Sequence, residues 1–234
     1  MLVLGIETSS PVASVAIVSA EGVKSEITLN AGFTHAEQLL PLIDDSLRQT
    51  RILRSDIEGI AVSGGPGSFT GLRIGMATAK GLAHALQLPL VSVPTLKALA
   101  FNYAHTQELC SPMMNARKNE IYTALFRWSD NILEQLHEDC AISAFKWAEK
   151  LKEYAQPVLL VGDGAWMNSE IWEKIIPQKG MIVPRISSIT RAAAVAWLGR
   201  EKLLSGEKGS LDQVKPVYIR IPEAEARLVR CKKD

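Results

Sequence analysis

The sequence predicts an α/β protein of two similar domains, each a mixed sheet with flanking helices. Residues 1–104 follow the order βββαβα, because short apolar runs alternate with segments of helical periodicity. The same order recurs in residues 105–234, although the two halves share negligible sequence identity. A more polar stretch at 103–109 separates them. We therefore expect an N-terminal domain at 1–104 and a C-terminal domain at 105–234, whose last segment can return to the first domain.

Strands are predicted where short apolar runs are bounded by turn residues. In the first half these runs are 2–8, 14–20, 23–30, 57–63 and 89–93. Glu21-Gly22 provides a tight turn between the second and third runs. In the second half the runs are 112–115, 120–128, 132–140, 158–161 and 181–183, and 216–219 is a candidate terminal strand.

Helices are predicted at 34–50, 69–86, 96–103, 143–154, from 165 onward, and 189–204. In the first helix, Thr34 and Glu37 have the spacing of a capping box, and Pro41 predicts a kink. Ser188 or Thr190 is a suitable N-cap for the last helix. The apolar face of the first helix is predicted to contain Ala36, Leu39, Leu40, Ile43 and Leu47.

The charge balance excludes a strong electrostatic footprint for nucleic acid or for a membrane surface. The chain has 26 basic and 25 acidic side chains, which gives a net charge of +1. A local exception is the basic tail with Arg227, Arg230, Lys232 and Lys233. Such a tail is usually only solvated, and RNA contact is the alternative.

The cysteines and the N-terminus favour a cytoplasmic protein. Cys110, Cys140 and Cys231 form no CxxC pair, and an odd number argues against a disulfide framework. The apolar N-terminus has no basic region or cleavage site of a signal peptide. No apolar run reaches the ~18 residues that span a bilayer.

A glycine-rich segment, GGPGSFTGLRIG, joins a predicted buried strand to the second helix at 64–75. Free N–H groups at such a helix N-terminus can hold an anion. No GK[ST] follows the glycines, so the segment is not a P-loop. The alternative is a tight loop that Ser68 caps.

The second helix contains glycines that need an explanation. Gly71, Gly75 and Ala79 are spaced by four residues and share one face, and Gly81 lies nearby. Three glycines in a helix cost on the order of 3 kcal/mol relative to alanine. Close packing of another backbone can offset this loss. The neighbour is either the protein's own sheet or a helix of a partner.

Two turns could bind phosphate if the chain were a kinase. Glu7 begins the turn Glu7-Thr8-Ser9-Ser10, and Gly162-Asp163-Gly164 follows a later strand. A plain strand-to-helix turn is the alternative for the second. The four histidines, His35, His84, His105 and His137, have no HExxH or HxxxH spacing, which argues against a zinc site.

Several of these segments resemble the TsaB family. They are LVLGIETSSPVASVAIV at 2–18, SGGPGSFTGLRIG at 63–75, MNARKNEIYTALF at 114–126 and VKPVYIR at 214–220. The resemblance covers essentially the whole chain, and the glycine-rich block is the most specific part. One departure is Asn115, where the family commonly has aspartate.

The resemblance implies two RNase H-like subdomains of the actin-like ATPase fold and no catalytic site. The family is similar to TsaD, a catalytic paralogue whose HxxxH motif binds metal. Thr95 and Leu99 stand where those two histidines would be, and neither can replace imidazole as a ligand. The resemblance therefore implies no metal and no cofactor on the chain alone, with ATP or ADP bound only within a complex.

The same resemblance implies a non-catalytic subunit of the complex that transfers threonylcarbamoyl to N6 of adenosine 37 in tRNAs reading ANN codons. The expected partners are a TsaD-like catalytic subunit, a TsaE-like ATPase and, in isolation, a second copy of the chain. Contact with tRNA is expected through the partner, and contact with a membrane is not expected. The candidate partner-binding residues lie on the first two helices: Leu39, Leu40, Ile43, Leu47, Gly71, Leu72, Gly75, Met76 and Ala79.

Two other functions remain as alternatives. An ATP-dependent kinase of the same fold would use Glu7, Asp163 and the Gly64–Gly67 loop. A metal-dependent, glycoprotease-like hydrolase is opposed by the lack of paired histidines. Nucleotide binding would favour the first, and stoichiometric zinc or iron the second.

Overall fold

The computed structural model describes residues 1–30, 35–207 and 211–220 and contains two five-stranded sheets. The first sheet has the order β3-β2-β1-β4-β5, with β1 (Val3–Glu7), β2 (Ala13–Ser19), β3 (Gly22–Leu29), β4 (Gly59–Ser63) and β5 (Leu90–Val93). The second has the order β10-β9-β6-β7-β8, with β6 (Leu109–Asn115), β7 (Glu120–Ser129), β8 (Ile132–Ser143), β9 (Val158–Val161) and β10 (Gly180–Ile182).

The two sheets have the same topology, which confirms the predicted duplication. In the first, β1 pairs antiparallel with β2 and parallel with β4. In the second, β6 pairs antiparallel with β7 and parallel with β9. Each central strand is buried almost along its whole length, because helices cover both faces of the sheet.

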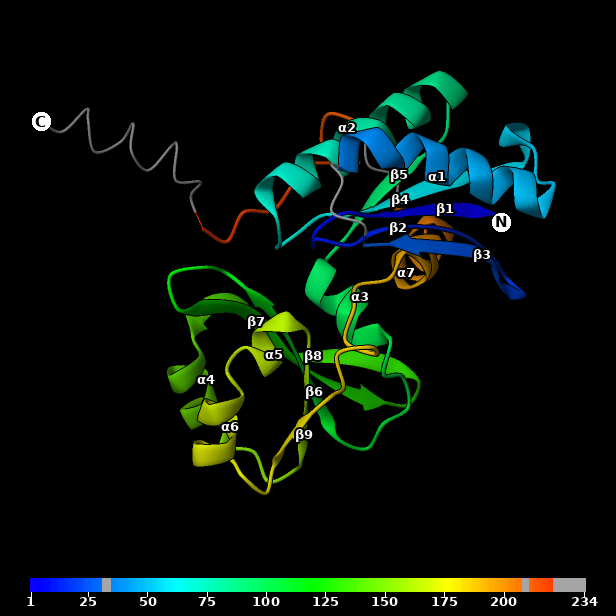
Figure 1. Cartoon of the computed structure of the whole chain (residues 1–234). Helices are drawn as coiled ribbons and strands as arrows, with labels where there is room; N and C mark the ends of the chain where they lie inside the picture. Colours follow the sequence, from blue (N-terminus) through cyan, green and yellow to red (C-terminus); the bar gives the residue numbers. More distant parts are fainter. Residues whose placement is uncertain (31–34, 208–210, 221–234) are drawn as a thin grey trace, which may run out of the picture.

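The first sheet lies between two helices on one face and one helix on the other (Figure 1). Helices α1 (His35–Thr50) and α2 (Phe69–Leu86) pack on the face of Leu4, Ile17 and Ile60. Helix α7 (Ala192–Leu204) packs on the opposite face. Its approach is close because a Cβ on Gly199 would lie 2.2 Å from the Cβ of Ala61.

The second sheet has the same layered arrangement (Figure 1). Helices α4 (Ala144–Leu151), α5 (Asp163–Trp166) and α6 (Ser169–Ile175) share a core with Met113 and Leu125. Helix α3 (Thr95–Phe101) packs on the other face, around Cys110 and Phe126. Residues of β6 and β7 alternate between these cores, as the two-residue period of a strand requires.

The two halves exchange their last helices. Helix α3 follows β5 in the sequence but packs against β6 and β7 of the second sheet. Helix α7 follows β10 but packs against β1, β2, β4 and β5 of the first sheet. The two helices also contact each other. The division at 104/105 stays a prediction about the sequence, whereas in space each half contributes a helix to the other.

Several predicted elements need correction. The helix expected from 165 onward is interrupted after Trp166, so α5 and α6 are two short helices. Residues 216–219 form no strand, since only the N–H of Val217 is bonded to the end of β4. Helix α7 begins at Ala192 rather than at 189. Its first amides are bound by Ser14 and Glu26 of the sheet instead of by Ser188 or Thr190.

The apolar face of α1 was predicted only in part. Leu39, Ile43 and Leu47 are buried, but Ala36 and Leu40 are exposed. Leu42 and Ser46 complete the buried face instead. Leu40 follows Leu39 by about 100° around the helix, and this rotation turns it away from the sheet. Thr34, the predicted cap, lies outside the described residues, and Pro41 lies inside the helix.

Candidate functional site

The predicted partner-binding residues are mostly internal. Leu40 is 52% exposed. The other eight are buried against the first sheet or between the helices: Leu39, Ile43, Leu47, Gly71, Leu72, Gly75, Met76 and Ala79. These eight residues are already packed within the chain, so they do not form an exposed surface.

The glycine stack of α2 packs against Thr8, the residue that directly follows strand β1 of the same chain. A Cβ on Gly71 would lie 2.0 Å from the main-chain oxygen of Thr8, and one on Gly75 would lie 2.2 Å from the Thr8 hydroxyl. The same hydroxyl donates to the main-chain oxygen of Gly71 at 2.9 Å. The structure therefore favours the internal explanation of these two glycines over the partner helix.

Gly81 is different, because the chain itself does not require a glycine there. It lies in the second half of α2 and is exposed, and among the described residues a Cβ at this position would meet no atom of another element within 4 Å. A glycine inside a helix costs about 1 kcal/mol relative to alanine. Ala77 and Ala85 are also exposed, one turn on either side. The outer surface of α2 is thus a ridge of small residues, which we call the outer ridge: Ala77, Gly81 and Ala85.

The turn after β1 is closed by the glycine-rich loop. The N–H of Ser68 donates to the main-chain oxygen of Ser9 at 2.7 Å, and a Cβ on Gly67 would lie 2.4 Å from that oxygen. Ser68 also caps α2 by accepting the N–H of Gly71 at 3.2 Å. The prediction of a Ser68 cap is confirmed, and the chain's own loop occupies the space beside this turn.

Glu7 is fully buried at the end of β1. Its Oε1 accepts the N–H of Ser9 at 2.6 Å, but its Oε2 has no hydrogen-bond partner among the described residues. Burial raises the pKa of this carboxyl from 4.5 to about 6, and the polar groups of Ser9 and Ser63 beside it oppose this rise. The hydroxyl of Ser9 is likewise buried and finds no partner in the part of the chain that the structure describes.

The turn at Gly162 connects β9 to the four-residue helix α5. Asp163 Oδ1 accepts the N–H of Asn115 at 3.0 Å, and Asn115 Oδ1 accepts the N–H of Arg117 at 2.8 Å. Burial raises the pKa of the Asp163 carboxyl. The residue that departs from the family pattern, Asn115, thus acts as an acceptor in its own turn, a role that aspartate could also fill.

Thr95 and Leu99, which the resemblance predicts to stand in place of two metal histidines, have structural roles on α3. Thr95 Oγ1 accepts the N–H of Gly65 at 3.1 Å, and Leu99 is buried in the core of the second sheet. The histidines of this chain are scattered; His35, for example, is hydrogen-bonded to the main-chain oxygen of Ser10 at 2.9 Å. Among the described residues, no three His, Cys, Asp or Glu side chains are grouped as a metal site.

Two further predictions concern the basic tail and the absence of a membrane-spanning helix. The basic residues Arg227, Arg230, Lys232 and Lys233, with Cys231, lie outside the described part of the chain. Of the helices in that described part, none combines the length and the apolar character that a bilayer crossing requires.

Sequence reasoning allowed the last segment to return to the first domain, but it missed the side-chain contacts of residues 211–220, which we call the strap. Tyr218 packs on Phe69 at the start of α2, with ring centroids 5.0 Å apart. Arg220 reaches the turn between β6 and β7, where its Nη1 donates to the main-chain oxygen of Ala116 at 3.0 Å. The signal that could have found them is the block VKPVYIR, which places an aromatic and a basic residue close together.

Comparisons with known proteins agree with this architecture. A family model described as TsaD, tRNA N6-adenosine threonylcarbamoyltransferase, matches residues 20–227. A relative from Bacillus subtilis, named tRNA threonylcarbamoyladenosine biosynthesis protein TsaB, is 32% identical over 233 residues, which cover 100% of both chains. The same name is given to an Escherichia coli protein that is 28% identical over 94% of this chain and 95% of its own.

A solved structure shows the same fold. It comes from Pseudomonas aeruginosa and is described as an uncharacterized protein with similarity to peptidase YeaZ. Its TM-score is 0.81 at 25% identity, and the match covers 94% of this chain and 99% of that one. The predicted fold of two actin-like subdomains is confirmed.

Proposed function

Because the chain belongs to the TsaB family of tRNA threonylcarbamoyladenosine biosynthesis, we propose that it is a non-catalytic subunit that binds and supports a TsaD-like catalytic subunit. The complex transfers threonylcarbamoyl from threonylcarbamoyl-AMP to N6 of adenosine 37 in tRNAs reading ANN codons. A TsaE-like ATPase joins it, and ATP or ADP binds only in the assembled complex. The tRNA contacts the catalytic partner rather than this chain, and the location is the cytoplasm.

The observation that carries this proposal is the outer ridge of α2. Gly81 is exposed in the middle of a helix, where the chain gains nothing from the missing side chain. A helix of a partner can approach closely over Ala77, Gly81 and Ala85, because small side chains leave room between the two backbones. Helix α1 lies beside α2 in a two-helix layer (Figure 1). Its Leu40 is an exposed apolar side chain.

The turn after β1 supports a binding role over a kinase role. In a kinase of this fold the turn must leave room for a phosphate group. Here the glycine-rich loop packs onto Ser9, and the N–H of Ser9 is taken by the Glu7 carboxyl. We therefore expect calorimetry to detect no ATP binding by the isolated chain, and clear binding would favour the kinase.

The test is a reconstituted tRNA modification assay that omits this chain and then restores it as wild type or as Gly81→Leu. We expect wild type to restore modification and the variant to lose at least tenfold in affinity for the TsaD-like subunit, since leucine would separate the helices. The same substitution should weaken the homodimer, which sedimentation velocity can measure.

The matched control is Lys146→Leu, which places leucine on the exposed side of α4 in the other half of the chain. We expect it to bind and support the TsaD-like subunit as wild type does. If Gly81→Leu were folded and fully active, the outer ridge would not be the binding surface. If the TsaD-like subunit were fully active without this chain, the supporting role itself would be wrong.

A further inference from the structure

The strap is anchored to the first half of the chain by backbone contacts. Val214 is buried in the core beneath α1 and α2. The N–H of Val217 donates to the main-chain oxygen of Gly64 at 2.7 Å. The main-chain oxygen of Val217 lies 2.5 Å from where a Cβ on Gly65 would be. The glycine-rich loop therefore lets the strap pass directly over the end of β4.

Side chains of the strap continue this attachment onto α2. The Arg73 guanidinium lies 3.8 Å from the centroid of the Phe69 ring, on which Tyr218 also packs. Arg73 Nε donates to the Tyr218 hydroxyl at 3.2 Å. Two aromatic rings and a cation in mutual contact hold the strap against the first turns of α2.

Beyond Tyr218 the strap crosses to the second half through Arg220. Its guanidinium donates to the main-chain oxygen of Ala116 at 3.0 Å and pairs with the Glu120 carboxylate at 3.1 Å. The turn between Ala116 and Glu120 is strained. Its residues Arg117, Lys118 and Asn119 all have φ between 52° and 61°, in the left-handed region that is unfavourable for residues with a side chain. Arg220 thus binds both ends of this turn and stabilises its unfavourable backbone conformation.

Several other links between the halves involve elements outside the strap. Helix α3 packs on the second sheet and continues into residues that contact the segment before α7. Asn102 Nδ2 donates to the main-chain oxygen of Ile189 at 3.3 Å, and the Tyr103 hydroxyl donates to that of Ser187 at 2.5 Å. These links use α3 and the segment that leads into α7, neither of which is part of the strap.

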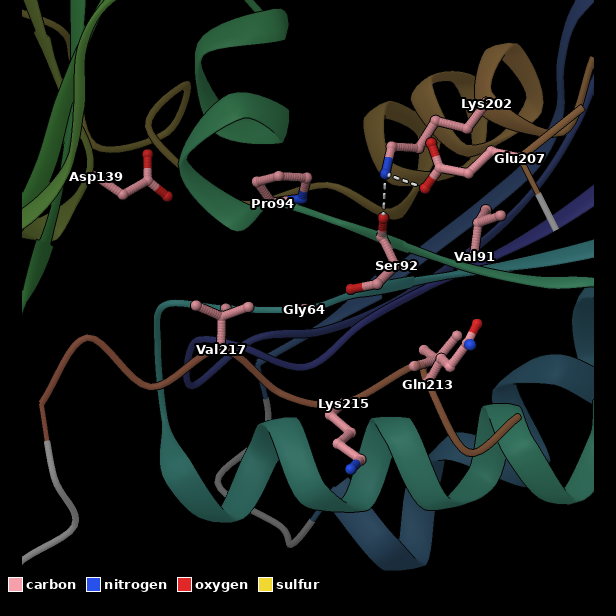
Figure 2. Close-up of a pocket in the computed structure, with 12 residues that line it drawn as sticks. Gly64, Val91, Ser92, Pro94, Asp139, Lys202, Glu207, Gln213, Lys215 and Val217 are labelled. Carbon is pink, nitrogen blue, oxygen red and sulfur yellow. Dashed lines mark hydrogen bonds and ion pairs between the residues drawn. The ribbon is translucent and has the colours of Figure 1, made fainter. Parts of the chain in front are cut away.

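We infer that the strap is a latch: Arg220 fastens the second half of the chain to the glycine-rich loop and α2, and so fixes the angle between the two halves. The α3 region is the hinge about which that angle would change. The strap also forms one wall of a cavity of about 520 Å³ (Figure 2). Across that cavity lie Val91 and Ser92 of the first sheet and Asp139 of the second. Release of the latch would widen this cavity.

The test compares Arg220→Ala with Arg127→Ala in the full chain. Arg127 is a matched control, because it pairs with Glu134 at 2.7 Å between neighbouring strands of a single sheet. Hydrogen exchange of the Val217 amide reports strap attachment, and small-angle scattering reports the angle between the halves. We expect Arg220→Ala to speed exchange at Val217 and at 116–120 about tenfold, as loss of a charge-assisted pair predicts, and to raise the radius of gyration. Arg127→Ala should change neither.

A second variant, Glu120→Gln, decides the matter if Arg220→Ala unfolds. It keeps the size of the side chain and removes only the charge that Arg220 meets. We expect faster exchange at Val217, although the affected residue is on the other half of the chain. Wild-type exchange at Val217 in Glu120→Gln, or an Arg220→Ala protein that matches the Arg127→Ala control in both measurements, would overturn the latch.

Discussion

A Cβ atom on Gly75 would lie 2.2 Å from the hydroxyl oxygen of Thr8, so the second helix touches the residue after the first strand at a point where no larger residue fits. Thr8 cannot move aside easily, because it is buried and its hydroxyl donates to the main-chain oxygen of Gly71. The glycines of α2 therefore differ in role. Gly71 and Gly75 allow close packing on Thr8, whereas Gly81 has no such contact among the described residues.

Gly75→Leu should therefore destabilise the chain, whereas Gly81→Leu should not. Overpacking a rigid site costs about 1–3 kcal/mol or more, and here the obstruction is the fully buried Thr8 directly after β1. At Gly81 leucine meets open space and improves helix propensity, so the isolated chain should gain up to about 1 kcal/mol. Urea unfolding followed by circular dichroism measures both. A Gly75→Leu protein of wild-type stability would show that α2 can shift away from β1.

Glu7→Gln should stabilise the chain at neutral pH but not at acidic pH. The folded state raises the pKa of Glu7 from 4.5 to about 6, so folding favours the protonated carboxyl. Stability is then lost as pH rises from about 4.5 to about 6, and the loss above that range is about 2 kcal/mol at 1.36 kcal/mol per pKa unit. Glutamine resembles the protonated acid at every pH and avoids this loss.

The measurement is the free energy of unfolding of both proteins at pH 4.5 and at pH 8. Glu58→Gln is the control of opposite sign, because the N–H of Leu2 lowers the pKa of Glu58, which therefore contributes stability at high pH. If the free energies of unfolding of wild type and Glu7→Gln differed by the same amount at pH 4.5 and at pH 8, the pKa of Glu7 would not be raised by folding.

Glu26→Ala should destabilise the chain by about 1–2 kcal/mol, the usual effect of losing a helix cap. Glu26 Oε1 accepts the N–H of Ala193 at 2.9 Å, and its other oxygen pairs with Arg191. The carboxylate thus holds the first turn of α7 on the sheet, and its side chain is only 12% exposed. Thermal unfolding of Glu26→Ala and Glu134→Ala provides the comparison. The second substitution removes an exposed pair and should change stability by less than about 1 kcal/mol.

Ser111 and Trp147 should be energetically coupled. The indole N–H of Trp147 donates to the Ser111 hydroxyl at 2.9 Å, and both residues are buried between β6 and α4. Ser111→Ala leaves this N–H without its partner, which costs about 1–3 kcal/mol. In Trp147→Phe the N–H is absent, so the further loss of the hydroxyl should cost less. A double-mutant cycle in urea should give a coupling of about 1 kcal/mol, and strict additivity would contradict it.

The duplicated fold could be predicted because its signals are local. Apolar runs of four to eight residues and helical periodicity appear within single elements, and their order is the same in both halves. The Ser68 cap follows from the same kind of short-range signal. The break between α5 and α6 could not be predicted from such a signal, since no glycine or proline marks the interruption after Trp166.

Contacts between distant segments could not be predicted in this way. Small residues spaced by four look alike whether they face a strand of the same chain, as Gly75 does, or open space, as Gly81 does. Similarly, nothing near Glu26 in the sequence indicates that it will cap a helix that begins at Ala192, far along the chain. Such pairings depend on the completed fold, which brings α7 onto the first sheet.

The exchange of α3 and α7 has a consequence for the order in which the protein can form during synthesis. When the ribosome has released β1 to β5, the face with Val3, Val18 and Ala61 still lacks its covering helix. That helix emerges only with residues 192–204, after all five strands of the second sheet. The nascent N-terminal half must therefore wait, with one apolar face uncovered, until the second sheet has also been synthesised.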